Sequence, residues 1–335
     1  MDRPVSPDLT ARFRAVLETH GLASRRLGIA VSGGADSLAL LLLAHSCIPD
    51  QIEAATVDHS LRPESASEVE HVAQICEQLG VRHTALKVEV EPRNVQANAR
   101  AARYAALGKW HDEAALDAIM TAHHADDQAE TLLMRLNRGS GLSGLSGVRA
   151  INDIPGRDGL LVRPLLSWRK AELEEIVKEA GLAHVDDPSN FDPRFDRARV
   201  RTALQTSEWL DSEALATSAT RLSEAWAAIE WFAREDWESN VQPLVEIEDQ
   251  PQLRGFRYSV KGPRLVAIET ILRIIGELGG KATRSDAGRL YDRLFAGDNA
   301  SLGGVLAVSE GKNGCDAAAN ARVWRFAPEP PRSQP

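Results

Sequence analysis

The stretch LGIAVSGGADS, residues 27–37, decides the fold because it joins a short apolar run to a glycine turn and then to a helical pattern. Residues 27–31 have the length of a buried strand, and an apolar helical pattern starts near Leu38. Glycines let the backbone come close to an anion, while the N-terminus of a helix offers free N–H groups and the positive end of its dipole. The stretch therefore predicts a phosphate-binding turn between the first strand and a helix.

This turn differs from the common lysine-containing phosphate loop, because Asp36 occupies the predicted anion site and no lysine accompanies it. An aspartate repels phosphate unless a cation lies between them, so the sequence predicts a magnesium ion that bridges Asp36 and a triphosphate. Ser32 and Ser37 could add hydroxyl donors. The plain alternative is a tight turn in which Asp36 only caps the helix. The complete SGGxDS pattern directly after a strand favours phosphate binding.

Strand and helix patterns alternate along the first half of the chain. Strands are predicted at 52–57, 82–88 and 117–122, and helices at 66–79, 95–114, 127–138 and 169–180. Alternation at this spacing indicates βαβ units, and the predicted fold class is α/β with a doubly wound parallel sheet. The glycine–serine stretch 139–147 is expected to be too flexible to form a regular element.

The pattern changes after Arg201, which places a domain boundary near Thr206. The predicted organisation is an ATP-binding catalytic domain at 1–205, a small mainly helical domain at 206–327 and a disordered tail at 328–335. Helices are expected at 212–239, 263–278 and 285–296, and strands at 304–309 and 322–327. Trp226 is expected in the core, and the packing interpretation extends to Trp209, Trp231 and Trp237.

The composition indicates a cytoplasmic protein. Of the 335 residues, 43% are hydrophobic and 26% charged, and the three cysteines lie far apart without a CxxC pair. The net charge of -9 argues mildly against nucleic-acid binding. Residues 92–111 and 131–152 nevertheless carry basic side chains and no acid, and residues 193–203 carry four arginines against one aspartate. A local basic face of this kind can bind RNA phosphates on an acidic protein.

Carboxylates and histidines cluster just after the fourth predicted strand. Asp127 and Glu130 lie three residues apart, so both carboxylates share one helix face and could hold an ammonium group. The same spacing also fits a helix-capping pair. His123 and His124, together with Asp126 and Asp127, could suggest a metal site. Adjacent residues of a strand point to opposite faces, however, so we expect instead that one histidine lines the nucleotide or substrate.

Two arginine pairs have helical spacing. Arg100 and Arg103 lie one turn apart with no nearby acid. This pair could be a solvated basic face, or its planar guanidinium groups could bind phosphates or the carboxylate of an amino acid. Arg197 and Arg201 also lie one turn apart, and they could bind ATP phosphates or the RNA backbone.

The segment SGGADS (32–37) resembles the signature of the PP-loop ATP pyrophosphatases. Members of that superfamily cleave ATP to AMP and pyrophosphate and adenylate a carbonyl oxygen, so that a nucleophile can displace AMP. Further segments resemble one of its families, the tRNA(Ile)-lysidine synthetases, in the expected order over about residues 30–201. They are VDHSLR (57–62), NVQA (94–97), ARAARY (99–104), TAHHADDQAET (121–131), RPLL (163–166), DPSN (187–190) and RARVR (197–201).

The last of these segments departs from the family's RNxxR pattern, because Ala198 stands where the asparagine is usual. This departure puts in doubt a role for the side chain at position 198, and leaves the expectations for Arg197 and Arg201 unchanged.

The resemblance implies a ligase that joins L-lysine to C2 of the wobble cytidine of tRNA(Ile) with a CAU anticodon, through an adenylated cytidine, releasing AMP and pyrophosphate. It implies ATP and Mg²⁺ as cofactors, tRNA(Ile) and free L-lysine as partners and no membrane, and it allows a homodimer. The residues expected to bind ATP are Ser32, Gly33, Gly34, Ala35, Asp36, Ser37, His123, Arg197 and Arg201, with Asp36 as the Mg²⁺ ligand. Those expected to bind the substrate lysine are Asp127, Glu130, Arg100 and Arg103. Those expected to act in catalysis are Asp36, Asp127, Glu130 and Arg100.

Three other functions remain open at this point. A tRNA thiolase of the same fold would need reactive cysteines, and Cys47 and Cys76 fall in predicted helices without a CxxC motif. A small-molecule PP-loop ligase would need no RNA. A non-catalytic nucleotide-binding module would not need Asp36 together with both carboxylates.

Overall fold

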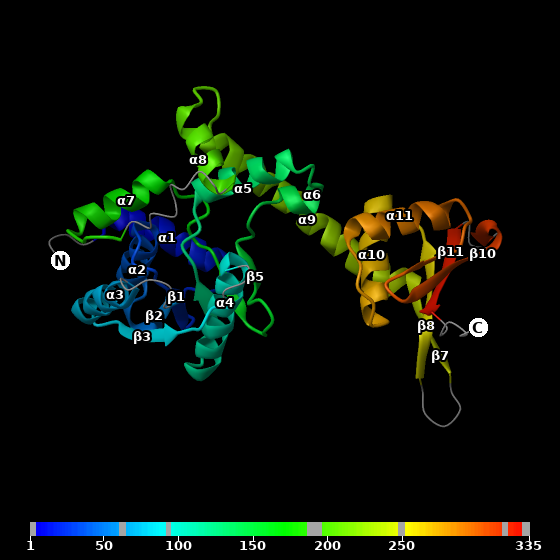
Figure 1. Cartoon of the computed structure of the whole chain (residues 1–335), viewed down its shortest axis with the longest axis horizontal. Helices are drawn as coiled ribbons and strands as arrows, with labels where there is room; N and C mark the ends of the chain where they lie inside the picture. The colour runs from blue at the N-terminus through cyan, green and yellow to red at the C-terminus, as the bar shows by residue number, and fades with distance from the viewer. Residues whose placement is uncertain are drawn as a thin grey trace. The chain divides into compact units, whose positions relative to one another are not determined.

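The computed structural model describes residues 5–59, 65–91, 95–185, 196–246, 252–316 and 321–329. Two compact units divide the chain, Met1–Ser223 and Glu224–Pro335, and each is described by itself (Figure 1). The division falls inside the long helix α9 (Ser212–Asn240), later than the boundary predicted after residue 205. That predicted boundary coincides with the end of α8 (Asp196–Thr206) and stays a prediction. None of the described helices is long and apolar enough to cross a membrane.

The first unit is built on a six-stranded sheet in the order β3-β2-β1-β4-β6-β5. All neighbouring strands are parallel except the edge pair of β5 and β6, which confirms the predicted doubly wound α/β fold. The strands are β1 (Leu27–Ala30), β2 (Ile52–Asp58), β3 (Arg82–Lys87), β4 (Ala118–Met120), β5 (Ile151–Asp153) and β6 (Leu160–Val162). The helices are α1 (Pro7–Thr19), α2 (Ala35–Cys47), η1 (Pro49–Gln51), α3 (Ser65–Leu79), α4 (Val95–Glu113), α5 (Ala125–Asn137), α6 (Leu142–Leu145), α7 (Lys170–Glu179) and α8.

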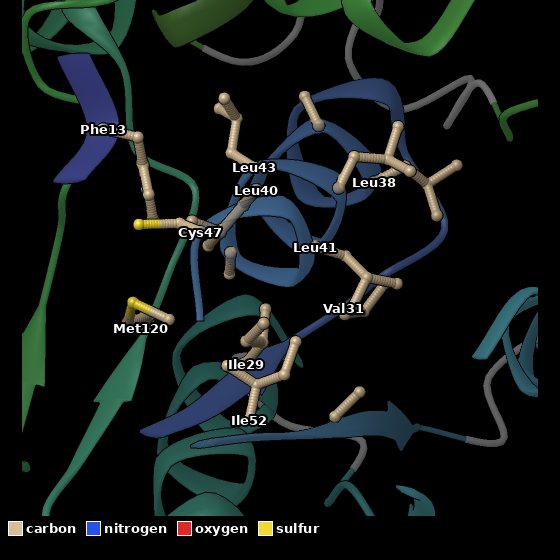
Figure 2. Close-up of a cluster of buried hydrophobic side chains, with 14 of the residues drawn as sticks. Phe13, Ile29, Val31, Leu38, Leu40, Leu41, Leu43, Cys47, Ile52 and Met120 are labelled. Carbon is tan, nitrogen blue, oxygen red and sulfur yellow. The ribbon is translucent and has the colours of Figure 1, made fainter. Parts of the chain in front are cut away.

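Helix α2 lies in the centre of the larger core of this unit. Its run from Leu38 to Ala44 is buried on every side, which is the pattern of a helix surrounded by protein. Figure 2 shows these leucines beside Phe13 of α1, Ile29 of β1 and Met120 of β4. Because the body of α2 is packed in this way, its N-terminus is held in a fixed position at the end of β1.

Helix α4 packs through a second cluster that contains residues of the same sheet, including Ala30 and Ile119. Gly28 of β1 makes this packing close. A Cβ atom at position 28 would lie 2.7 Å from carbon atoms of the Trp110 ring and 2.6 Å from Cδ1 of Leu116. Such distances are too short for carbon atoms, so the position admits no side chain without movement of the helix or the ring.

We expect Gly28→Ala to lower the free energy of unfolding by about 1–3 kcal/mol, because it overpacks a dense core. Urea unfolding would measure the change. Gly141→Ala is a suitable control, since a Cβ atom there would meet nothing within 4 Å. Equal stability of the two variants would show that the core beside Trp110 is looser than the structure indicates.

The second unit combines helices with a five-stranded sheet in the order β7-β8-β11-β10-β9. Its strands are β7 (Val241–Glu246), β8 (Gln252–Val260), β9 (Ala300–Leu302), β10 (Val305–Asp316) and β11 (Ala321–Pro328), and its helices besides α9 are α10 (Arg264–Glu277) and α11 (Arg284–Phe295). Both helices and the last two strands agree with the predicted elements. The sequence pattern does not indicate β7, β8 and β9, so the description of this domain as mainly helical understates its strand content.

The tryptophans divide into two groups. Trp226 is buried, as predicted, and Trp237 packs against Phe256 with ring centroids 5.3 Å apart. The packing interpretation is wrong for Trp209 and Trp231, which are 82% and 52% exposed. The predicted disordered tail starts at Pro328, the last residue of β11, and residues 330–335 lie outside the described part of the chain.

Candidate active site

The chemistry-bearing residues gather at the carboxyl ends of the parallel strands. The segments that follow β1, β2, β4 and β6 are the turn at 32–37, His59, the run 121–124 and Arg163. The strand order reverses direction between β1 and β4, which lie side by side in the sheet. In doubly wound sheets this switch point is where ligands bind. The predicted phosphate-binding turn and the predicted carboxylate pair flank it.

The turn at 32–37, called the phosphate turn below, is held by its own serines. Ser37 Oγ donates to the carbonyl of Gly34 at 2.9 Å and accepts from the N–H of Ser32 at 3.1 Å, and the two serine hydroxyls lie 3.2 Å apart. Gly33 adopts a φ of 85°, which favours glycine. Gly34 is the N-cap of α2 and offers no capping side chain, so the helix start is suited to an external anion.

One carboxylate oxygen of Asp36 is buried without a hydrogen-bond donor beside it in the described part of the chain. Its Oδ1 is buried and has no hydrogen-bond partner among the described residues, while its Oδ2 lies 3.5 Å from Nε2 of His124. A hard cation such as Mg²⁺ binds carboxylate oxygens, so the site fits the predicted ion. Within the described ranges, no group of three His, Cys, Asp or Glu side chains could hold a metal. An ion on Asp36 would therefore take further ligands from phosphates and water, as Mg²⁺ commonly does.

His124 joins the two halves of the site. Its buried imidazole lies 3.5 Å from Asp36, 3.7 Å from Asp126 and 3.6 Å from Asp127. Burial alone would lower the pKa of His124, but the surrounding carboxylates outweigh it and raise the pKa to about 10. The imidazole is therefore a cation at neutral pH.

The protonation of His124 makes stability depend on pH. The folded-state pKa of about 10 exceeds the unfolded value of about 6.5. Protonation of His124 therefore stabilises the fold fully below pH 6.5, and this contribution is lost as pH rises through 10.

Asp126 adds a second pH dependence at the acid end. Burial opposes the ionisation of Asp126, but His124 and the Lys170 N–H, which donates at 2.8 Å, lower its pKa to about 2. Its contribution is thus present above pH 4 and lost as pH falls toward 2.

We expect His124→Gln to destabilise the metal-free protein most between pH 4 and 6.5. The deficit in unfolding free energy should shrink steadily toward pH 10, and chemical unfolding at several pH values would measure it. His20→Gln, at the end of α1, is the control for replacing a histidine away from the site. A deficit for His124→Gln that is constant from pH 5 to 10 would contradict the proposed charge on His124.

Asp127 and Glu130 face the same side of α5, as predicted, and are called the carboxylate pair below. Both contact Arg197 of α8, whose Nε donates to Glu130 at 2.6 Å and whose Nη2 donates to Asp127. Arg201 Nε donates to the other oxygen of Glu130 at 2.6 Å. Glu130 is only 2% exposed, so it is a buried carboxylate bridged by two arginines. The two arginines predicted to bind ATP therefore form ion pairs with the carboxylates predicted to bind lysine, Arg197 with both and Arg201 with Glu130.

The predicted capping role of the carboxylate pair is corrected in one respect. Helix α5 begins at Ala125 with His124 as its N-cap, and the His124 N–H donates to Asp127 Oδ2 at 3.1 Å. Asp127 is therefore the third residue of the helix rather than its cap. Glu130 lies beyond the first turn and takes no part in capping.

Arg100 and Arg103 lie on α4, and His123 follows β4. Arg100 is exposed, and its guanidinium carbon lies 5.0 Å from the centre of the Tyr104 ring. Burial lowers the pKa of Arg103, opposed by Tyr104 and assisted by the charge of Arg100. Burial also lowers the pKa of His123 to about 4, against the influence of Asp127 and with that of the neighbouring arginines. His123 is therefore neutral, and its Nδ1 lies 3.1 Å from the Thr121 hydroxyl.

Two residues of the family-like segments, to which the sequence analysis gave no role, also shape the site. Arg163 is buried after β6 and donates to the carbonyl of Arg149 at 2.8 Å and to Asn152 at 3.0 Å, while its Nε has no hydrogen-bond partner in the described ranges. Gln128 clamps the backbone of Val148, donating at 2.7 Å and accepting at 2.6 Å. The only signal for this contact in the sequence was the amide of Gln128 directly after Asp127.

The clamp corrects the prediction for the glycine–serine stretch 139–147. The sequence predicts no regular element there, yet the stretch contains the short helix α6. Arg135 also holds it, donating to the carbonyls of Gly144 and Gly147. Gly147 has a φ of 67°, and a Cβ atom there would lie 2.5 Å from the Gln128 side-chain oxygen.

The cysteines do not provide a nucleophile in the described region. Cys47 and Cys76 are buried and unpaired, and burial raises the pKa of Cys76 to about 11. Reactive cysteines are instead exposed enough to react and have lowered pKa values. The side chain of Cys315 and the predicted segment 187–190, with Arg62 and Asn94, lie outside the described residues.

The fold, the phosphate turn and Asp36 define a PP-loop protein, and the family model of the PP-loop domain matches residues 5–208. The chain is 42% identical to the tRNA(Ile)-lysidine synthase of Novosphingobium aromaticivorans, over 96% of this chain and 94% of that one. It is 41% identical to the corresponding synthase of Zymomonas mobilis, over 93% and 91% of the two chains. The chain thus belongs to the tRNA(Ile)-lysidine synthase family.

Among solved structures, the chain is similar to the U34-tRNA thiolase NcsA of Methanococcus maripaludis, with a TM-score of 0.53 over 66% of this chain and 79% of the other. The two sequences are 16% identical, so the similarity concerns the fold alone.

Proposed function

We propose that this enzyme uses ATP to join L-lysine to C2 of the wobble cytidine of tRNA(Ile) with a CAU anticodon, forming lysidine, AMP and pyrophosphate. The family of ligases to which the chain belongs supports this reaction. The structural observation that supports it best is the adjacency of two subsites. His124 Nε2 lies 3.5 Å from Asp36 of the phosphate turn and 3.6 Å from Asp127 of the carboxylate pair.

The first step activates the cytidine. The oxygen on C2 is a poor leaving group, so O2 attacks the α-phosphorus of ATP and pyrophosphate departs. The phosphate turn would bind the phosphates through the backbone N–H groups of Gly33–Asp36, with His123 lining the nucleotide. A Mg²⁺ ion on Asp36 would neutralise charge that develops on the pyrophosphate. The tight packing of α2 supports this step, because it holds the N–H groups in place before ATP arrives.

The second step transfers lysine. The ε-amine, once it has lost a proton, attacks C2, and the C2–O bond breaks as AMP leaves. We propose that the carboxylate pair binds an ammonium group of lysine and that Arg100 and Arg103 bind its carboxylate. Lysine carries both charges, and the two sets of residues would supply both counter-charges, the pair from α5 and the arginines from α4.

The tRNA would contact basic surfaces of the first unit. Residues 95–113 of α4 and 196–206 of α8 carry exposed arginines, among them Arg100 and Arg199, on a protein with a net charge of -9. The wobble base lies in a single-stranded loop, so extruding it for reaction costs little. We further propose that the second unit positions the tRNA, that the enzyme acts in the cytoplasm, and that it forms a homodimer, which sedimentation would test.

The decisive experiment is incorporation of radiolabelled lysine into acid-precipitable RNA. The purified protein is incubated with ATP, Mg²⁺ and unmodified tRNA(Ile) bearing CAU, with tRNA(Met) as the matched control. We expect label only in tRNA(Ile), dependent on ATP, with AMP and pyrophosphate formed in equal amounts. Splitting of ATP to AMP and pyrophosphate without labelled tRNA would refute lysine transfer while leaving the PP-loop chemistry in place.

A further inference from the structure

The carboxylate pair already has a cationic occupant. Arg197 spans both members, reaching Glu130 at 2.6 Å through Nε and Asp127 through Nη2. Arg201 holds the remaining oxygen of Glu130 at 2.6 Å. Two carboxylates therefore face two guanidinium groups, and their charges already balance. A substrate ammonium added to this arrangement would be a third cation and would be repelled.

The two arginines differ in how easily they could leave the carboxylate pair. Arg201 is 19% exposed, whereas Arg197 is 45% exposed and is the second residue of α8. An arginine side chain that is half in solvent can swing away from its partners at a lower desolvation cost than a buried one. Arg197 is thus the cation that an incoming ammonium would replace.

We propose that Arg197 is a placeholder for the substrate ammonium. Lysine displaces the Arg197 guanidinium from Asp127 and Glu130, Arg201 remains on Glu130, and the released guanidinium becomes free to bind ATP phosphates. This inference rests on the proposed function, because it takes the carboxylate pair as the lysine site. It adds to that function two alternative partners for Arg197: the carboxylate pair before lysine binds, and the ATP phosphates afterwards.

The exchange couples the two substrates. In the free enzyme, lysine binds only the fraction of molecules in which Arg197 has left the pair, so its apparent affinity is reduced by that fraction. ATP phosphates favour the released position of Arg197 and should therefore tighten lysine binding. By thermodynamic reciprocity, lysine should tighten ATP binding by the same factor.

Equilibrium dialysis with radiolabelled lysine, without tRNA, tests the placeholder. The protein is measured alone and with a non-cleavable α,β-methylene ATP analogue. We expect Arg197→Gln to bind lysine roughly tenfold more tightly than wild type without nucleotide, the factor expected if Arg197 is released in about a tenth of molecules. The analogue should then tighten lysine binding to wild type and have no such effect on the variant. Arg197→Lys, which keeps a positive charge, should bind lysine as weakly as wild type.

Arg199→Gln is the matched control, because Arg199 lies on the same helix and pairs with Asp196 rather than with the carboxylate pair. Its lysine affinity should equal that of wild type. Unchanged or weaker lysine binding by Arg197→Gln, measured at a temperature where the variant is fully folded, would overturn the placeholder role and leave the reaction standing. Absence of lysine binding in wild type and in every variant would overturn both the placeholder and the lysine site.

Discussion

Replacement of Asp36 by asparagine is expected to slow cleavage of ATP severely while the protein stays folded. The buried Oδ1 of Asp36 has no protein partner in the described ranges, so the amide loses no hydrogen bond at that atom. The variant does lose the charge that Oδ2 places 3.5 Å from Nε2 of His124, which should cost some stability. The negative charge is what would hold Mg²⁺ against the departing pyrophosphate. Removing one preorganised electrostatic contact of this kind typically costs about 3–4 kcal/mol in the transition state, or roughly 10²–10³-fold in rate. Release of pyrophosphate in the presence of tRNA(Ile) would measure the loss.

Asp50→Asn provides the comparison, since Asp50 is an exposed residue of η1 at the other end of α2. It should retain the wild-type rate. Unfolding of Asp50→Asn in urea should agree with wild type within about 1 kcal/mol, as expected for a change outside the core, and Asp36→Asn should be fully folded at the assay temperature. If Asp36→Asn cleaved ATP within fivefold of the wild-type rate over a series of Mg²⁺ concentrations, Asp36 would not be a ligand of the ion.

The phosphate turn could be predicted from sequence because its determinants are local. The apolar run, the glycine that adopts a φ of 85° and the leucine-rich helix follow one another within twenty residues. The strand–helix alternation likewise predicts a parallel sheet, and a parallel sheet brings the ends of β1 and β4 together whatever the details of the loops. The pattern of residues along the chain is therefore enough to assign Asp36 and Asp127 to one site.

The pairing of Arg197 and Arg201 with Glu130 could not be predicted in the same way. These partners are 67 and 71 residues apart in the chain, and nothing in either segment alone indicates the other. The sequence instead assigns the arginines and the carboxylates separately, to phosphates and to lysine. Ala198, between the two arginines, is buried and offers no side-chain hydrogen bond, so the polar contacts here belong to its neighbours.

The strands β7, β8 and β9 of the second unit could not be predicted from the sequence for a different reason. In β8 the alternation of Phe256, Tyr258 and Val260 has the period of a strand, but arginines and a glycine interrupt the apolar character of the segment. Only the pairing of β8 with β11 and β7 explains why such a polar sequence is extended. Strands whose stability comes from distant partners are poorly marked in their own residues.

Glu130→Gln is expected to lose both stability and lysine transfer. Glu130 accepts from Arg197 and Arg201 at 2.6 Å each and is almost fully buried. The amide cannot neutralise either guanidinium, and its NH₂ group would face a donor. Breaking a fully buried ion pair costs about 3–5 kcal/mol, and because both arginines are partly exposed we expect about 2–4 kcal/mol here. Labelled-lysine incorporation should fall at least about 100-fold if the carboxylate orients the amine for attack.

Glu175→Gln separates this effect from the loss of any ion pair, because Glu175 pairs with Lys178 on the exposed face of α7. Exposed pairs of this spacing are worth about 0.3–0.5 kcal/mol, so that variant should keep its stability and its activity. The two outcomes of Glu130→Gln also separate from each other. If stability falls but lysine incorporation by the folded fraction is normal, Glu130 only anchors α8 on α5. If incorporation falls at a temperature where the variant is fully folded, the carboxylate acts on lysine itself. The variant site then lacks the negative charge that binds the ammonium group of lysine.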